Sequence, residues 1–223
     1  MPLVEMKGLA FSYSSGPEII SVPQFKLESG ERLFLHGPSG SGKTTFLGII
    51  AGVLSPSRGE ISILGKYLGK MSGPQRDRFR ADHLGIIFQQ FNLVPYLSVL
   101  ENVMLAAEVS IIKASRLQEK SLKAEALRLL RSLEMESVAD KSVLNLSVGQ
   151  QQRVAVARAM IGSPELIIAD EPTSALDSDL RAEFLKLLFE QVLAAKSGLI
   201  FVSHDRGLAN EFDRSLSLSE VSR

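Results

Sequence analysis

The sequence predicts an α/β fold, in which a mostly parallel sheet is accompanied by an antiparallel β subdomain and an inserted α-helical subdomain. Four short apolar runs without polar alternation are typical of strands buried on both faces of a parallel sheet. A long amphipathic stretch between the second and third runs indicates the helical insertion. The chain has 223 residues and 45% hydrophobic content, which is enough for one sizeable core. The apolar runs lie at residues 31–37, 83–89, 165–170 and 198–204.

The order of the predicted elements supports this fold. Alternating apolar and polar residues in the first thirty positions predict antiparallel strands beside the core. The run at 31–37 ends in glycine and precedes a segment with helical spacing at 44–54. The segment 115–135 predicts one amphipathic helix, and the segment 179–195, closed by Gly198, predicts a crossover helix between the last two runs. The apolar side of the amphipathic helix holds Leu122, Ala126, Leu129, Leu130 and Leu133.

The stretch "NLSVGQQQRVAVARAM" at 145–160 predicts another helix with a sharply defined start. Ser147 and Gln150 have the spacing of a capping box, in which each side chain satisfies a backbone N–H of the other residue. Gly162, followed by Pro164, marks the end of the helix. One face of this helix carries Val154, Ala157, Arg158 and Ile161.

The composition excludes several classes of protein. Lys and Arg together number 25, as do Asp and Glu, so the formal net charge is zero and we expect no nucleic-acid partner. The absence of cysteine excludes disulfides and thiolate metal sites. No apolar run approaches the ~20 residues of a membrane-spanning helix, and the first residues lack a signal-peptide pattern. We therefore expect a soluble, cytoplasmic protein in which any membrane role comes through a partner.

A phosphate-binding motif follows the first apolar run. The sequence "GPSGSGKT" matches the pattern G-x-x-x-x-G-K-[ST] in full, between a predicted strand and a predicted helix. Glycines let the backbone approach phosphates closely, and N–H groups at a helix start favour negative charge. Lys43 can reach β- and γ-phosphates, and the Thr44 hydroxyl suits Mg²⁺. The predicted loop consists of Gly37, Pro38, Ser39, Gly40, Ser41, Gly42, Lys43 and Thr44.

Three ionisable residues end two other apolar runs. Asp170 and Glu171 follow "LIIA", and His204 ends "LIFVSH". Because ligands bind at the carboxyl edge of an open α/β sheet, we expect all three at the phosphate site. Asp170 can hold Mg²⁺, Glu171 can polarise an attacking water, and His204 can contact the γ-phosphate.

Five motifs together resemble one known family. The stretches "GPSGSGKT", "FQQFNLVP", "LSVGQQQR", "LIIADEPTSALD" and "VSH" occur in the order found in ABC-type ATPase subunits, and the resemblance covers essentially the whole chain. It implies a P-loop NTPase core that binds and hydrolyses ATP with Mg²⁺. It also implies a single ABC-type ATPase domain over 1–223, with a nucleotide-binding core at 1–88 and 148–223 and a helical signature subdomain at about 89–147.

The resemblance assigns roles to further residues. Tyr13 is the residue expected to stack on adenine, with Phe11 a weaker candidate and an ordinary strand-face aromatic the alternative. Gln89 matches the glutamine that contacts the metal and the attacking water, although the adjacent Gln90 leaves the register open. Asp177 matches the family's D-loop.

The same resemblance completes the set around the triphosphate. It extends the phosphate loop from Gly37 to Thr45. It gives Asp170 a metal-ligand role, Glu171 the role of catalytic base, and His204 the role of switch histidine.

The resemblance also implies a function for the helix start at 147–150. In this family it binds the nucleotide that is held by a second copy of the chain, so that two chains stack head to tail around two ATP molecules. Ser147, Gly149 and Gln150 are the contacts implied here. Val148 departs from the common "LSGGQ", and we expect the site to stay competent because Ser147 and Gly149 retain the contact groups.

A patch of apolar residues around Pro95 is a candidate docking surface for a membrane permease. The alternative is that these side chains form the small core of the helical insertion. The residues of the motifs resemble those of the subgroup that serves lipoprotein release and macrolide export with FtsX-type permeases. This resemblance implies a position on the cytoplasmic face of the inner membrane. The patch consists of Phe91, Leu93, Val94, Tyr96 and Leu97.

Three other functions are alternatives to a transporter ATPase. A GTPase or small-molecule kinase would leave the 147–150 motif and His204 unexplained, and the guanine-reading Lys-x-Asp pattern is absent. A soluble ABC protein of DNA repair or translation usually carries two cassettes or a long coiled coil. A membrane signalling complex without transport would use the same ATPase, so the sequence leaves that alternative open.

Overall fold

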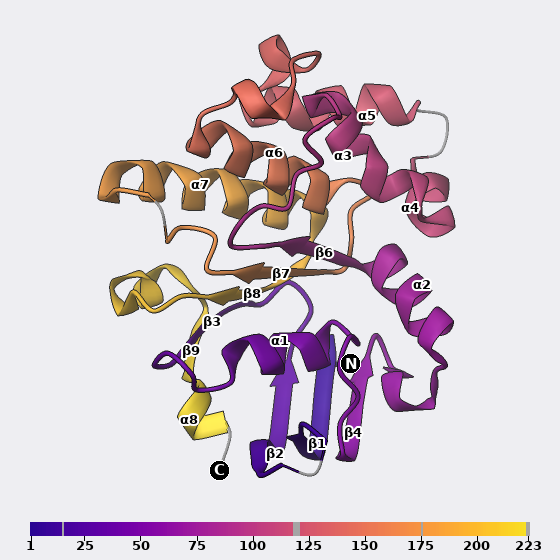
Figure 1. Cartoon of the computed structure of the whole chain (residues 1–223), viewed down its shortest axis with the longest axis vertical. Coiled ribbons are helices and arrows are strands. Elements are labelled where there is room, and N and C mark those ends of the chain that lie inside the picture. The colour runs from indigo at the N-terminus through magenta and orange to yellow at the C-terminus, as the bar shows by residue number, and fades with distance from the viewer. Residues whose placement is uncertain (15, 118–120, 175, 222–223) are drawn as a thin grey trace. The chain divides into compact units, whose positions relative to one another are not determined.

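The computed structural model describes residues 1–14, 16–117, 121–174 and 176–221, and the chain forms two compact units (Figure 1). The first unit combines Met1–Arg80 with Gly198–Arg223, and the second unit is Ala81–Ser197. Both contain strands and helices, which agrees with the predicted α/β class. No helix within the described residues is long and apolar enough to cross a membrane.

The first unit contains an antiparallel sheet and a parallel group of strands. The antiparallel sheet has the order β2-β1-β4-β5, and β3 pairs in parallel with both β8 and β9. The prediction of antiparallel strands in the first thirty residues is confirmed, and two further strands join them. The strands are β1 (Val4–Ser12), β2 (Glu18–Leu27), β3 (Arg32–His36), β4 (Arg58–Ile63), β5 (Lys66–Tyr67), β8 (Gly198–Val202) and β9 (Arg214–Ser217).

The helices of the first unit are short, and one of them begins at the phosphate motif. Helix α1 packs on the antiparallel sheet, where Phe46 meets Phe25 edge to face with ring centroids 5.5 Å apart. This contact fixes the helix start relative to the sheet. The helices are α1 (Lys43–Ile50), α2 (Gly73–His83, whose last three residues belong to the second unit) and α8 (Leu218–Val221), with 3₁₀ turns at Leu68–Lys70 and Arg206–Glu211.

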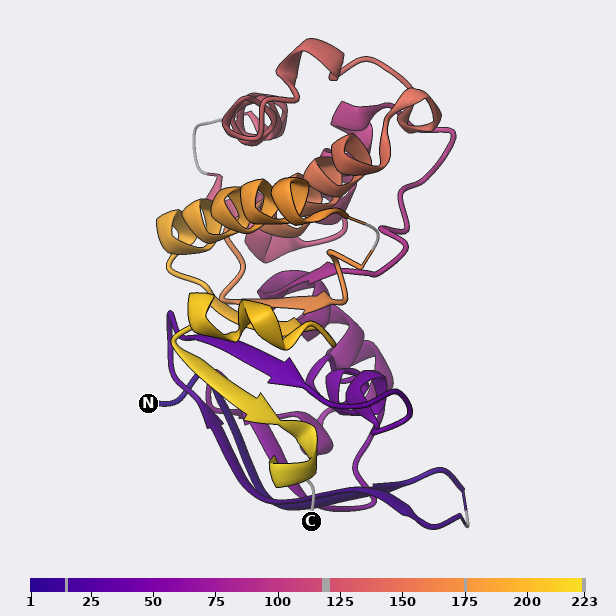
Figure 2. The same ribbon diagram turned by 90° about the vertical axis from the view of Figure 1, so that its left-hand side faces the viewer.

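The second unit is mostly helical. Strands β6 (Leu84–Ile87) and β7 (Leu166–Asp170) pair in parallel, and α6 and α7 lie on one side of this pair (Figures 1 and 2). Gly85 is required in β6, because a Cβ there would lie 2.2 Å from the carbonyl oxygen of Ala159 in α6. The helices are α3 (Val99–Glu108), α4 (Ile111–Arg116), α5 (Leu122–Ser132), α6 (Val148–Met160) and α7 (Ser178–Ala195), with 3₁₀ turns at Glu136–Val138 and Val143–Asn145.

Two predicted helices need correction. The single amphipathic helix expected over 115–135 is two helices, because the Ser121 side chain accepts a hydrogen bond from the N–H of Ala124 and starts α5 anew. Residues 118–120 lie outside the described residues. Helix α7 ends at Ala195 as predicted, but the residue that closes it is Lys196, in the left-handed conformation (φ 55°), and Gly198 is the first residue of β8.

The limits of the compact units differ from the predicted limits of the subdomains. The unit boundaries fall at 80/81 and 197/198, whereas the predicted helical subdomain spans about 89–147. The difference arises because α6 contacts α3, α5, α7 and β6, so these elements cluster with the helical segment. The division into a nucleotide-binding core and a signature subdomain stays a prediction about function.

Candidate functional site

The phosphate motif forms a tight loop between β3 and α1. Gly40 and Gly42 have φ of 77° and 90°, which are left-handed values that favour glycine. Gly37 faces Ser41 so closely that a Cβ there would lie 2.7 Å from the Ser41 Oγ. The loop therefore curls over the start of α1, as the sequence pattern predicted.

Positively polarised groups converge inside this loop. No side chain caps α1, because its N-cap residue is Gly42, and the first N–H groups of a helix have no intrahelical acceptor. The Lys43 ammonium is buried and donates to the carbonyl oxygens of Gly37 (2.9 Å) and Pro38 (3.0 Å). The buried Ser41 hydroxyl has no hydrogen-bond partner within the described residues. These donors fit the oxygen atoms of a triphosphate.

Two neighbouring side chains supply the groups expected next to the phosphates. The Thr44 side chain is exposed in the first turn of α1, so its hydroxyl is available to a metal ion. Tyr13 is 51% exposed, its hydroxyl lies 3.2 Å from Thr45 Oγ1, and its ring meets the Phe11 ring edge to face at 4.8 Å. Phe11 is buried, so Tyr13 is the better placed of the two aromatic candidates to stack on a base.

His204 belongs to the same unit as the phosphate loop. Strand β8, which pairs with β3, ends at Val202, and the exposed His204 follows two residues later. Asp205 accepts a hydrogen bond from the Gly207 N–H at 3.0 Å and so fixes the turn after the histidine. The expected position of His204 just beyond a parallel strand is confirmed.

The two acidic candidates lie in the second unit, where β7 ends. Asp170 is the last residue of β7, and Glu171 follows it with a left-handed backbone (φ 46°). Such a conformation in a non-glycine residue is strained and is often found at functional sites. The buried Gln152 side chain of α6 donates to the Pro172 carbonyl and holds the chain immediately after Glu171.

The glutamine candidates follow the neighbouring strand. Strand β6 ends at Ile87, and Gln89 and Gln90 are both exposed beyond it. Because β6 and β7 are parallel, Gln89 lies at the same end of this strand pair as Asp170. Exposure does not distinguish Gln89 from Gln90, so the choice of Gln89 stays a prediction.

The predicted capping box at the start of α6 is confirmed. Ser147 Oγ accepts from the Gln150 N–H at 3.3 Å, and Gln150 Oε1 accepts from the Ser147 N–H at 3.0 Å. Val148 is the first helical residue and has no positive φ, so a β-branched side chain is tolerated there. A Cβ on Gly149 would meet nothing within 4 Å, so the surface beside the Ser147 hydroxyl is open.

A cavity of about 450 Å³ joins this helix start to the start of α7. Its lining includes Ser147, Gly149 and Gln150, which the resemblance assigned to the nucleotide of a second copy, and Asp177, which it matched to the D-loop. The Asp177 carboxylate caps α7 by accepting from the Leu180 N–H at 3.0 Å. The second unit therefore brings these four residues to one opening.

The candidate docking patch divides into an inner and an outer part. Phe91 is 7% exposed and packs inside the helical unit, whereas Tyr96 is 85% exposed. The alternative of a small core therefore describes Phe91, and docking at Tyr96 stays a prediction. The structure also shows two residues that sequence analysis did not identify as functional, Asn102 and Arg158, whose side chains hydrogen-bond to the backbone of this segment. The only sequence signal was the charge of Arg158 on the apolar face of its helix.

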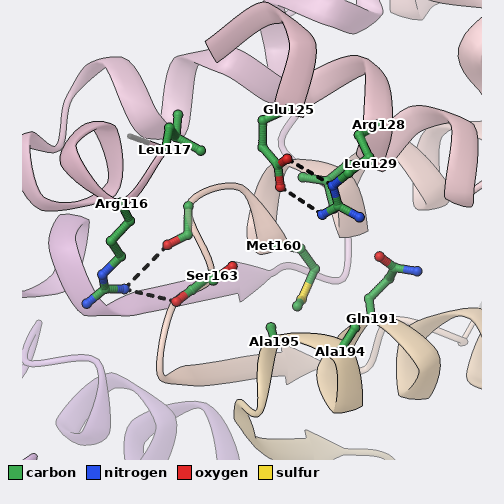
Figure 3. A pocket seen from close by; sticks show the side chains of 11 residues that line it. Arg116, Leu117, Glu125, Arg128, Leu129, Met160, Ser163, Gln191, Ala194 and Ala195 are labelled. Atoms are coloured by element: carbon green, nitrogen blue, oxygen red, sulfur yellow. Dashed lines mark hydrogen bonds and ion pairs between the residues drawn. The ribbon is translucent and has the colours of Figure 1, made fainter. Parts of the chain in front are cut away.

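A larger cavity in the second unit contains no predicted site residue. It has a volume of about 600 Å³ and lies among α4, α5, α7 and the chain after α6 (Figure 3). Its two arginines already have acidic partners, since Arg128 pairs with Glu125 and Arg116 pairs with Glu165. Neither of these two arginines, among the described lining residues, is therefore left without a carboxylate for a nucleotide to replace.

Comparisons with known proteins agree with the geometry. Residues 20–174 match the family described as ABC transporter. The chain is 39% identical to the uncharacterized ABC transporter ATP-binding protein YbbA of Escherichia coli, over 97% of this chain and 94% of that one. It is 36% identical to the lipoprotein-releasing system ATP-binding protein LolD 2 of Rhodospirillum rubrum, over 98% and 94%. Among solved structures, a dimeric post-hydrolysis state of the ATP-binding cassette MJ0796 bound to ADP and Pi superposes with a TM-score of 0.84 at 33% identity, covering 96% of this chain and 93% of that one.

Proposed function

Because this chain belongs to the ABC transporter family, we propose that it is the ATPase subunit of a membrane exporter of the lipoprotein-release type, in which it acts as a head-to-tail dimer. The chain is an ATP-binding and ATP-hydrolysing subunit of an ABC system. The observation that carries the proposal is the capped but open start of α6. Such a surface, which already has its own cap, suits a second contact to a nucleotide held elsewhere.

The phosphate loop performs the primary binding in this proposal. The Lys43 ammonium, the N–H groups at the start of α1 and the Ser41 hydroxyl hold the phosphates, and Tyr13 stacks on the adenine. Thr44 and Asp170 would hold Mg²⁺, since this ion is usually bound by one or two protein oxygens together with phosphates. When bound, Mg²⁺ neutralises charge on the phosphate oxygens.

Hydrolysis is assigned to the groups at the ends of β7 and β8. Glu171 accepts a proton from the attacking water, Gln89 orients that water, and His204 contacts the γ-phosphate. The left-handed backbone of Glu171 and the bond from Gln152 to Pro172 fix the direction in which the carboxylate leaves the strand. Neither feature depends on a bound nucleotide, so the base is positioned in advance.

The dimer supplies the remaining contacts. Ser147 accepts from Gln150, so its hydroxyl hydrogen is left to donate to a γ-phosphate held by the other copy. Gly149, Gln150 and Asp177 lie around the same opening. The solved relative MJ0796 is a dimer bound to ADP and Pi, which supports a nucleotide-dependent dimer here.

The permease partner is proposed to dock at the segment 91–97. Tyr96 is exposed at the tip of this segment, and large aromatic side chains are frequent anchors in protein interfaces. The lipoprotein-releasing relatives match over more than 90% of their own length, whereas a 35% identical spermidine/putrescine import ATP-binding protein of Legionella pneumophila matches over only 55% of its length, and this difference supports release or export over import. In this arrangement the chain lies on the cytoplasmic face of the inner membrane, where it is held by the permease.

The substitution Glu171→Gln tests the mechanism. It removes the proton acceptor and keeps the size of the side chain, so Mg-ATP should still bind, steady-state hydrolysis should fall by about 100-fold or more, and a dimer should accumulate. Light scattering at saturating Mg-ATP measures the dimer. A monomer under those conditions, or turnover close to that of the native chain, contradicts the proposal. Glu190→Gln, at an exposed position of α7 outside the opening at 147–150, is the matched control and should leave turnover unchanged.

A further inference from the structure

The segment 91–98 is held in shape by an amide that is buried in α3. Asn102 is 0% exposed, and its Oδ1 accepts from the Val94 N–H at 2.7 Å. Its Nδ2 is directed at the carbonyl oxygens of Val94 (3.1 Å), Leu97 (3.3 Å) and Ser98 (2.9 Å). Because α3 begins directly after this segment, Asn102 gives the segment a local fold. It does not connect the segment to a distant part of the chain.

A second side chain makes that distant connection. Arg158 lies near the end of α6, and its Nη1 and Nη2 donate to the carbonyl oxygens of Asn92 (2.6 Å) and Phe91 (2.5 Å). Phe91 and Asn92 both have left-handed backbones, with φ of 58° and 48°. Two successive residues of this kind are disfavoured and need support from their surroundings. The planar guanidinium fork supplies that support.

The guanidinium of Arg158 has a different kind of partner from the guanidinium of Arg153 on the same helix. Burial lowers the pKa of Arg158, and no carboxylate within the described part of the chain lies at ion-pair distance from it. Arg153, on the same helix, pairs with the carboxylates of Glu134 (2.8 Å) and Glu183 (2.5 Å). A half-buried arginine that binds only backbone carbonyls is thus suited to fixing the path of the chain, and lysine cannot reproduce its fork.

We propose that Arg158 is a positioning residue that makes the orientation of α6 control the conformation of the segment 91–97. The start of α6 carries Ser147, and its last full turn carries Arg158, so one rigid helix joins the nucleotide contact to the proposed docking segment. This inference rests on the proposed function, because it takes Ser147 as the contact to the partner's nucleotide. It adds a defined route by which nucleotide binding alters the surface that the permease meets.

A spin label tests this connection in the isolated chain. The sequence has no cysteine, so Tyr96→Cys in the Glu171→Gln background gives a single attachment site on a side chain that is 85% exposed. We expect Mg-ATP to change the mobility of the nitroxide. With Arg158→Lys added, the ATP-dependent dimer should persist and the change in mobility should be lost. The control Arg131→Lys, at an exposed arginine of α5 that pairs with Glu136, should retain both.

The possible results separate this inference from the proposed function. A dimer that forms with Arg158→Lys and still shows the full change in nitroxide mobility overturns the role of Arg158 and leaves the proposed function intact. Failure of the Glu171→Gln chain to dimerise overturns the proposed function, and this inference fails with it. Loss of the mobility change in the Arg131→Lys control as well overturns the specific role of Arg158.

A second measurement keeps Arg158 in place, in case Arg158→Lys does not fold. In the Glu171→Gln chain, hydrogen exchange of the backbone amides from 91 to 98 should change by about fivefold or more on addition of Mg-ATP, a size expected of coupling between two sites. The amides of α3 after residue 104 serve as the internal reference. Exchange of 91–98 that is the same with and without nucleotide, in a sample that has dimerised, overturns the inference.

Discussion

Two helix starts in this molecule suit phosphate, and they are built differently. Helix α1 begins after Gly42, which has a left-handed backbone and offers no side-chain cap, and the Lys43 ammonium is buried beside it. Helix α6 begins after Ser147, which is capped reciprocally by Gln150 and has no lysine in its first turn. The start of α1 leaves its backbone N–H donors without acceptors, whereas at the start of α6 the Ser147 side chain already accepts from one backbone N–H.

The difference indicates which site binds nucleotide alone. An uncapped helix start with a buried ammonium gains much from an anion, because unsatisfied donors and positive charge are both relieved. A capped start with no cation gains less, since it offers one hydroxyl and the remaining N–H groups. The α1 start therefore suits primary binding, and the α6 start suits a weaker contact that matters only when another copy brings its nucleotide. Substitutions at the two helix starts separate these roles.

The largest expected effect comes from removing the cation of the first site. Lys43→Met keeps most of the side-chain volume but loses the ammonium, so ATP hydrolysis should fall by about 100-fold or more and ATP affinity should fall with it. Isothermal titration with ATP and a phosphate-release assay measure the two quantities. Lys66→Met, an exposed lysine of β5 in the same unit, should change neither. Nearly native hydrolysis by Lys43→Met would remove the basis for treating α1 as the primary site.

The next effect tests the second site against a structural twin. Ser147→Ala and Ser98→Ala each remove the serine of a complete capping box, one on α6 and one on α3. Both should lower the free energy of unfolding by about 1 kcal/mol. Only Ser147→Ala should also lower hydrolysis, by about 10-fold or more, because it alone loses a hydrogen bond to a charged phosphate.

Ser147→Ala and Ser98→Ala serve as controls for each other. ATP affinity of the monomer should be nearly unchanged in both variants, since the first site is intact. Equal losses of hydrolysis in the two variants would mean that a weakened helix start, and not a lost nucleotide contact, explains the Ser147→Ala result.

Local patterns made both helix starts predictable from the sequence. The phosphate loop needs glycines and a lysine at fixed spacing, and a capping box needs two residues three apart, so each is visible within eight residues. The four buried strands were predictable for the same reason, because a short run of apolar residues identifies each one. The pairing of β4 with β1 was not predicted, since it joins residues 48 to 59 positions apart and β4 is half exposed.

The missed features depend on contacts between distant residues. Sequence analysis placed Arg158 on the apolar face of α6 correctly but could not name its partners, because Phe91 and Asn92 lie more than sixty residues away. The end of α7 at Ala195 was predicted correctly, but Gly198 was expected to close the helix, and Lys196 occupies the left-handed position instead. The roles of Gln89 and Asp177 in catalysis and dimer contact stay predictions.

The smallest expected effect is that of Gly149→Ala, and Gly42→Ala at the other helix start is its counterpart. Gly42→Ala should lower the free energy of unfolding by about 2 kcal/mol, because Gly42 has φ 90° and a Cβ would lie 2.8 Å from Ile20 Cδ1. Gly149→Ala should raise it by about 0.5–1 kcal/mol, because Gly149 has ordinary helical backbone and open space around its Cα. Urea unfolding of the nucleotide-free chain measures both changes. If Gly149→Ala is more stable than the native chain and yet hydrolyses ATP several-fold more slowly, the open surface at Gly149 contacts the nucleotide of another copy. If hydrolysis is unaffected, the α6 start makes no close contact at this position.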